Sequence, residues 1–173
     1  MMWPTDTLIL WHGTDTNSAT AIKNSRVRRI TQRPGMKMQT WDFGAGFYTT
    51  THRDKAVAWA QTRAYVSGRS GIPMLVRFEV PVQEFTNLEK LAFGDGGPGA
   101  DLYWSFVAAC RSGAAYHNPV KGWTFPAVVG PVSASIGPVL SQRTLVPDVD
   151  QISFHHPHGI SFINKFPRQV ETP

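Results

Sequence analysis

Cysteine is scarce in this sequence, because Cys110 is the only one among 173 residues. A lone cysteine excludes a disulfide within the chain, so we expect a fold that does not depend on an oxidising compartment. Cys110 lies in an apolar run, which predicts a place in the core. Charged residues are also few, at 17%. No apolar run reaches the roughly 18 residues of a membrane span, so no membrane partner is expected.

The start of the chain has no basic segment ahead of its apolar residues, so we expect no standard secretory signal. We expect a soluble monomer, either cytoplasmic or delivered into a target cell by a route without such a signal. The length of 173 residues and a hydrophobic content of 42% suit one domain with a substantial core, spanning residues 1–173. The net charge is +5, but the basic residues are scattered except for Arg26, Arg28 and Arg29. This cluster is more typical of a solvated face than of a nucleic-acid groove.

Hydrophobic runs bounded by glycine and proline predict an α+β fold with mostly short strands and about three helices. Strands are expected at residues 8–11, 47–51, 74–80, 127–129 and 151–155, and helices at residues 17–24, 54–65 and 101–111. Asp54 is expected to cap the second helix. Leu102, Phe106 and Val107 are expected to form an apolar stripe on the third. A short helical turn is expected at residues 87–92, and irregular structure at residues 133–147.

Three polar residues, His12, Tyr48 and Gln151, lie at the ends or edges of predicted strands. A rigid strand end can hold a side chain in a fixed position, as a catalytic or binding site requires. Taken singly, each is more typical of an ordinary surface residue or of a satisfied polar residue in the core. Their order along the chain and the motifs around them carry the functional interpretation.

Four motifs share the order found in one known family. WHGT at residues 11–14 ends the first strand, and FGAGFY at residues 43–48 precedes a helix. Trp59 follows the tyrosine of that motif by eleven residues, and Gln151 opens the QISF strand. The sequence resembles the poly(ADP-ribose) polymerase-like branch of the ADP-ribosyltransferase superfamily, called H-Y-E after its motif residues. The resemblance runs from about residue 8 to 166 and is strongest to small bacterial and fungal domains of this branch.

The resemblance implies a single-domain ADP-ribosyltransferase fold, with split, mostly antiparallel sheets flanked by helices and a central cleft for NAD as co-substrate. It implies that the backbone of Gly13 binds the nicotinamide carboxamide. His12, supported by Thr14, would bind the adenosine ribose hydroxyls. Tyr48 and Trp59 would hold the nicotinamide ring between two π faces. His12, Tyr48 and Gln151 would then be the catalytic set.

The same resemblance implies that Gly46 and Phe47 belong to the cofactor-binding residues, with Gly46 letting the backbone pass close to NAD. Two positions depart from the branch. Gln151 stands where the family has a glutamate, so it offers a hydrogen bond without a charge. Ala56 stands where the family has a nicotinamide-binding serine. Asp150 is a second choice for the carboxylate, since strand alternation directs it to the opposite face.

The resemblance as a whole implies an NAD-dependent mono-ADP-ribosyltransferase that releases nicotinamide, of the kind used as a toxin or effector. The expected acceptor is a protein side chain, for which a ubiquitin threonine is one possibility, and nucleic acid is the less favoured acceptor. An NAD glycohydrolase and a catalytically inactive NAD- or partner-binding module stay open as alternatives. No metal is expected, because Pro157 interrupts the histidines of residues 155–158 and no cysteine accompanies them. Arginines of residues 23–33, Arg53 or Arg63 would contact the pyrophosphate.

Overall fold

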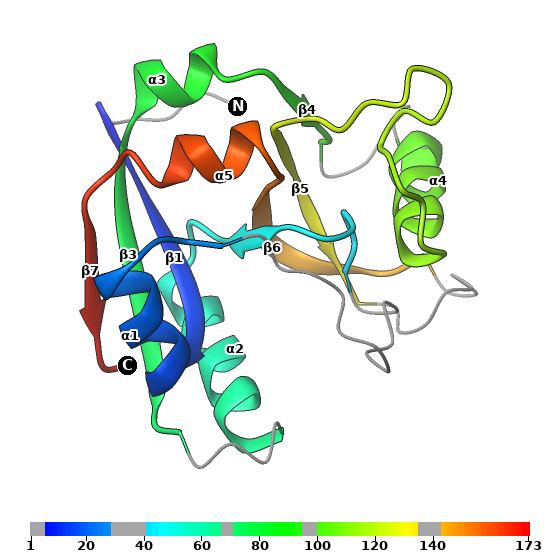
Figure 1. Ribbon diagram of the computed structural model, residues 1–173. Helices are drawn as coiled ribbons and strands as arrows, with labels where there is room; N and C mark the ends of the chain where they lie inside the picture. Colours follow the sequence, from blue (N-terminus) through cyan, green and yellow to red (C-terminus); the bar gives the residue numbers. More distant parts are fainter. Residues whose placement is uncertain (1–5, 29–40, 67–70, 95–99, 135–142) are drawn as a thin grey trace.

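The structure is a computed structural model that describes residues 6–28, 41–66, 71–94, 100–134 and 143–173. Within these ranges it contains both helices and strands, which confirms the α+β class (Figure 1). The strands are β1 (Thr7–Asp15), β2 (Phe47–Thr49), β3 (Pro73–Pro81), β4 (Lys90–Ala92), β5 (Ala127–Ser133), β6 (Leu145–Phe154) and β7 (Arg168–Glu171). The helices are α1 (Thr16–Asn24), α2 (Arg53–Val66), α3 (Val82–Asn87), α4 (Ala100–Arg111) and α5 (His158–Ile163).

The strands form two sheets. The first has the order β1-β3-β7 and is antiparallel throughout. The second has the order β2-β6-β5-β4, in which only the β4–β5 pair is parallel. Except for β5 and β6, which follow each other along the chain, neighbouring strands are far apart in sequence, so both sheets depend on long-range pairing.

In the described ranges, the backbones of the two sheets pair at one bridge, which joins Trp11 of β1 to Thr50, the residue after β2. The backbone N–H of Trp11 donates to the carbonyl of Thr50 at 2.8 Å, and the N–H of Thr50 donates back to Trp11 at 3.0 Å. Within the described ranges no ladder continues the β1–β2 pairing beyond this bridge. The two sheets therefore separate beside this bridge, at residues 11–13 of β1 and residues 48–50.

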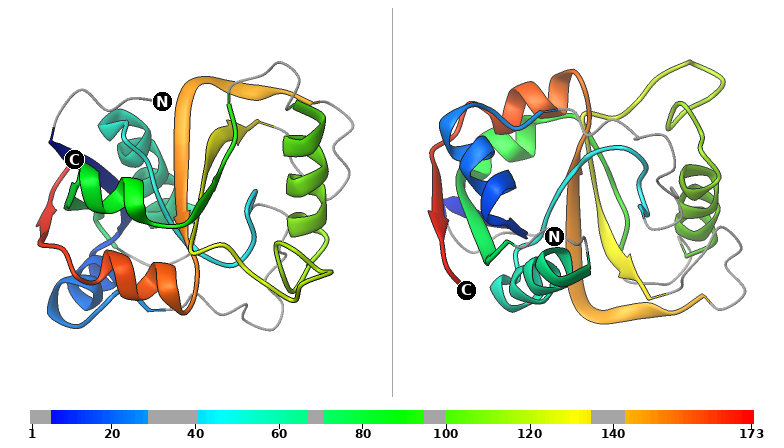
Figure 2. Two further views of the ribbon diagram at one scale, coloured as in Figure 1. Left: turned by 90° about the horizontal axis from the view of Figure 1, so that it is seen from above. Right: turned by 60° about the horizontal axis from the view of Figure 1, so that its bottom comes forward.

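The main core lies between the facing sides of the two sheets. It includes Leu10 and Phe78 from the first sheet and Phe47, Ile152 and Phe154 from the second, all at most 2% exposed. The far side of the second sheet is covered by α4, which carries a second apolar cluster (Figures 1 and 2). The far side of the first sheet is covered by α2 through Ala56 and Ala60. Each helix thus buries the outer face of one sheet.

Several local expectations are corrected by the structure. The N-cap of α1 is Asp15, whose Oδ1 accepts from the N–H of Ser18 at 2.9 Å. The expectation that Asp54 caps α2 is wrong, because the helix already begins at Arg53 and Asp54 lies in its first turn. Leu102 is also misplaced on the apolar stripe of α4, since it is 70% exposed. The prediction that Cys110 is a core residue is confirmed.

The end of the chain differs most from expectation. Residues 145–150 belong to β6, although residues 133–147 were expected to be irregular. The strand at residues 151–155 is not the last element, because α5 and β7 follow it. The helical turn expected at residues 87–92 is replaced by the end of α3 and by β4. Among the residues that the structure describes, no helix is long and apolar enough to cross a bilayer.

Candidate functional site

His12 lies at the point where the two sheets separate. Its Nδ1 is 2.7 Å from the backbone carbonyl oxygen of Tyr48. A carbonyl only accepts, so Nδ1 carries the proton and Nε2 of the neutral ring is left as an acceptor. The ring packs against Phe47 with centroids 4.3 Å apart. The imidazole thereby occupies the Tyr48 carbonyl, which would otherwise be available for pairing between β1 and β2.

The environment keeps His12 neutral. Desolvation by burial lowers the pKa of this imidazole to about 4, and it outweighs the opposite effect of the hydrogen bond to Tyr48. At neutral pH the group therefore offers a lone pair at Nε2, and it can accept a hydrogen bond from a hydroxyl.

Gly13 follows His12 on β1. Its backbone polar groups and the position of its missing side chain lie in different surroundings. Backbone groups alternate in direction along an antiparallel strand. Since both polar backbone groups of Trp11 point to Thr50, those of Gly13 point to the same edge of β1, beyond the bridge. The position of a side chain on Gly13 is blocked, because an added Cβ would lie 2.0 Å from the carbonyl oxygen of Ala56 in α2. Glycine is required here by the close approach of α2.

Tyr48 contacts both His12, where the sheets separate, and the face of the second sheet that α4 covers. Its backbone carbonyl holds His12, while its ring packs in the α4 cluster, 6.4 Å from the ring of Phe43. The hydroxyl donates to the carbonyl of Gly44 at 2.7 Å and accepts from the N–H of Phe43 at 3.0 Å. Burial raises the pKa of this phenol well above its usual value. The Tyr48 hydroxyl therefore fixes the loop before β2.

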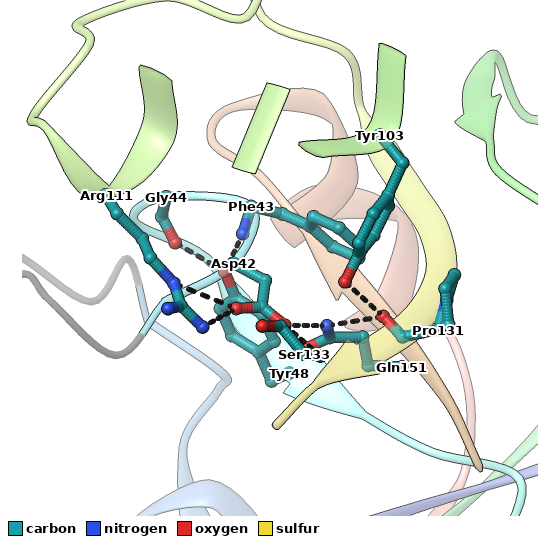
Figure 3. Close-up of polar contacts among 9 residues, drawn as sticks. All are labelled: Asp42, Phe43, Gly44, Tyr48, Tyr103, Arg111, Pro131, Ser133 and Gln151. Atoms are coloured by element: carbon teal, nitrogen blue, oxygen red, sulfur yellow. Dashed lines mark hydrogen bonds and ion pairs between the residues drawn. The ribbon is translucent and has the colours of Figure 1, made fainter. Parts of the chain in front are cut away.

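Gln151 lies on β6, on the same face of the sheet as Tyr48, because Tyr48 pairs with Ser153. Its side chain is 5% exposed. Nε2 donates to Oδ2 of Asp42 at 2.6 Å and to the carbonyl of Pro131 at 2.9 Å (Figure 3). Gln151 is thus part of a polar network rather than an isolated side chain.

A buried ion pair anchors this network. Asp42 accepts from Nη2 and Nε of Arg111, the last residue of α4. The two side chains are 4% and 3% exposed. The other carboxylate oxygen also accepts from the N–H of Ser133 at 2.8 Å. Neither charged residue was among the predicted site residues, and the one signal in the sequence is that Asp42 directly precedes the FGAGFY motif.

Asp150 points away from Gln151, as strand alternation predicted. Its Oδ1 accepts from the hydroxyl of Thr50 and the N–H of Thr51, each at 2.8 Å. Its Oδ2 accepts from the hydroxyl of Thr51 at 2.7 Å. Asp150 therefore ties β6 to the segment between β2 and α2 and is not the carboxylate of the Gln151 network.

The other predicted site residues are distributed as follows. Thr14 is 1% exposed and Phe47 lies in the main core at 2%, so the Phe47 ring points away from Tyr48. Gly46 passes His155 so closely that an added Cβ would lie 2.7 Å from its ring. Trp59 is partly buried on α2, and no ring contact joins it to Tyr48 within the described ranges.

A second cluster, also missed from the sequence, contains two histidines. The ring of His155 lies 4.4 Å from that of His117. His155 contacts Ser153 Oγ at 2.8 Å and the Ala45 carbonyl at 3.1 Å, and His117 Nε2 lies 3.0 Å from the Phe43 carbonyl. Both histidines thus hold the loop before β2. No group of residues suited to a metal ion occurs in the part of the chain that the structure describes.

An open groove of about 650 Å³ lies between the segment after α1 and α5. Arg26, Arg28 and Lys165 line it, together with His156. These two arginines belong to the segment proposed for the pyrophosphate, and the structure places them against α5 rather than against His12. The rest of that segment, residues 29–33, lies outside the described ranges.

Comparison with known families adds one assignment. A family model described as "Protein of unknown function (DUF3990)" matches residues 8–134. The chain belongs to the DUF3990 family. The match covers β1 to β5 and includes His12, Tyr48 and Asp42, and it ends before Gln151. A search of curated proteins finds no match to the chain.

Proposed function

We propose that this DUF3990 protein is an NAD-dependent mono-ADP-ribosyltransferase with an ADP-ribosyltransferase-type split sheet. The observation that carries the proposal is the arrangement at the split. No described residue bonds to Nε2 of His12 there, and the amide and carbonyl of Gly13 point to the same edge. On the adjoining strands, Tyr48 and Gln151 share one face.

The arrangement complements the parts of NAD. A carboxamide has one N–H donor side and one acceptor oxygen, and it matches the carbonyl and N–H that a single strand residue presents side by side. Gly13 offers this pair. The neutral Nε2 of His12 would accept from a ribose hydroxyl. The ring of Tyr48 would contact one side of the nicotinamide, and Trp59 on α2 the other.

In the proposed reaction the bond between the ribose C1′ and the nicotinamide nitrogen breaks. Its electron pair leaves with nicotinamide, which becomes neutral, and positive charge develops on the ribose. A hydroxyl or other nucleophile of a protein acceptor then bonds to C1′ and loses its proton. The Gln151 amide oxygen would accept from a hydroxyl of the reacting ribose and keep it oriented.

The test is release of free nicotinamide from NAD by the purified protein, with and without cell extract as a source of acceptor. We expect release by the unmodified protein and at least a tenfold loss in Trp59→Ala. Tyr65→Ala is the matched control, because Tyr65 is an aromatic residue of the same helix that is 78% exposed. The proposal fails if the unmodified protein binds NAD without releasing nicotinamide under either condition.

A non-catalytic NAD-binding module is the second candidate, and one feature favours it. The Gln151 side chain carries no charge, and its nitrogen is already committed to Asp42 and Pro131. Calorimetric binding of NAD with no turnover would support this candidate. Turnover that needs no macromolecular acceptor would instead indicate a glycohydrolase that uses water.

A further inference from the structure

We propose that Asp42 is a positioning residue that orients the Gln151 amide, so that its oxygen Oε1 is the group presented to substrate. The inference deepens the proposed function and rests on it. It starts from the two partners of Nε2, which are a carboxylate oxygen at 2.6 Å and the Pro131 carbonyl oxygen at 2.9 Å. Both partners only accept hydrogen bonds, so the amide nitrogen, with its two protons, must face them.

The amide oxygen is the remaining polar atom of Gln151. Among the residues that the structure describes, Oε1 accepts no hydrogen bond, and this atom is not fully buried. It is therefore the one polar atom of this side chain that a donor group of a ligand can engage. An amide oxygen accepts and does not donate, so this site selects a ligand with a donor, such as a ribose hydroxyl.

The orientation of Asp42 is itself fixed. One carboxylate oxygen is held by Arg111, and the other accepts from the backbone N–H of Ser133. Asp42 cannot rotate away without losing these bonds. The chain therefore holds the Gln151 amide so that its oxygen, a hydrogen-bond acceptor, takes the place of a carboxylate oxygen.

This arrangement predicts that a negative charge at position 151 lowers activity, although the family has a glutamate there. If the missing charge limited the reaction, Gln151→Glu would raise nicotinamide release. In the network described here, the new carboxylate would face the Asp42 carboxylate and the Pro131 carbonyl, which are acceptors as well. We therefore expect Gln151→Glu to lower the turnover of nicotinamide release at neutral pH at least tenfold, with a smaller effect on the KM for NAD.

The pH profile separates orientation from a general loss of structure. When the introduced carboxyl is protonated, its O–H can donate to Asp42, and its carbonyl takes the place of Oε1. The deficit of Gln151→Glu relative to the unmodified protein should thus shrink as pH falls from 8 to about 5.5. In the double variant Gln151→Glu, Asp42→Asn, the asparagine supplies an amide donor to the new carboxylate. Nicotinamide release by the double variant should be at least tenfold faster than by Gln151→Glu alone. A deficit that is independent of pH, or two substitutions whose effects simply multiply, would overturn the proposal.

A readout without turnover keeps this inference distinct from the proposed function. In the unmodified protein, both side-chain amide protons of Gln151, assigned by their loss in Gln151→Glu, should exchange with water at least tenfold more slowly than those of exposed Gln61. If either proton exchanges as fast as those of Gln61, the orientation is wrong whether or not the protein is an enzyme. Slow exchange without nicotinamide release would retain the network and refute the transferase. This measurement uses the unmodified protein, with Gln151→Glu needed only to assign the signals. It therefore remains possible if Asp42→Asn fails to fold.

Discussion

Acid should destabilise this protein through histidines that are buried in the neutral form. His155 is 2% exposed. Desolvation by burial, and then the nearby His117, lower the pKa of His155 to about 3. Desolvation lowers the pKa of His12 to about 4 and also lowers that of His117. Protonating any of them would place a charge among partners arranged for a neutral ring.

The sign and size follow from linkage. An unfolded histidine has a pKa near 6.5, so below that pH the unfolded chain binds more protons than the folded chain. The free energy of unfolding therefore falls as pH falls from about 6.5 towards the folded pKa values. With folded values of about 3 for His155 and about 4 for His12, each costs about 2 kcal/mol between pH 7.5 and 5. The sum of about 4 kcal/mol is a large part of a typical stability.

Urea unfolding followed by tryptophan fluorescence at pH 7.5, 6.5, 5.5 and 5.0 measures this dependence. His155→Gln should reduce the loss of unfolding free energy between pH 7.5 and 5 by about 2 kcal/mol, whatever its stability at pH 7.5. His158→Gln is the control, because it removes an exposed imidazole. A free energy of unfolding that is flat over this range, or a full pH dependence in His155→Gln, would contradict the expected role of the buried histidines.

Three further outcomes are expected. Gly13→Ala should lower the free energy of unfolding by about 2 kcal/mol, because its Cβ would lie 2.0 Å from a backbone oxygen of α2. The same change at Gly94, which has open space, should alter the free energy by less than about 0.5 kcal/mol in urea titrations. Asn164→Ala should cost about 2 kcal/mol in the same assay, since it removes hydrogen bonds to the segment after α1, while exposed Asn17→Ala serves as control. Burial raises the pKa of the Cys110 thiol to about 12, so its labelling by iodoacetamide should track unfolding.

Strong local patterns predicted the elements that form most of the fold. The apolar runs at residues 8–11, 74–80 and 101–111 correspond to β1, β3 and α4, although β1 continues through Gly13 to Asp15, beyond the turn expected after residue 11. The first part of β6 escaped prediction because it contains Pro147 and then Asp148, which has a positive φ of 53°. Such residues are typical of loops. Only the pairing with β5, which includes an irregularity between Pro131 and Ser133, makes this segment a strand.

The candidate site was predictable to a different extent. The motif order located His12, Tyr48 and Gln151, because each lies in or beside a run with clear strand character. The partners of these residues were not predictable, since Asp42 and Arg111 meet across 69 positions of sequence. Nothing local distinguishes a buried, paired charge from an exposed one. The consequence is chemical, because without Asp42 the Gln151 amide nitrogen keeps only the Pro131 carbonyl as a partner.

Gly13 shows how one residue supports two different arguments. The approach of α2 is sufficient to require glycine there, because no side chain fits beneath the Ala56 carbonyl. Glycine in the WHGT motif is therefore accounted for by packing, and its identity alone is no argument for nicotinamide binding. The argument for binding comes from the backbone, whose direction is set by the Trp11–Thr50 bridge. The bridge and the split beside it, rather than the identity of residue 13, therefore carry the argument for the proposed carboxamide site.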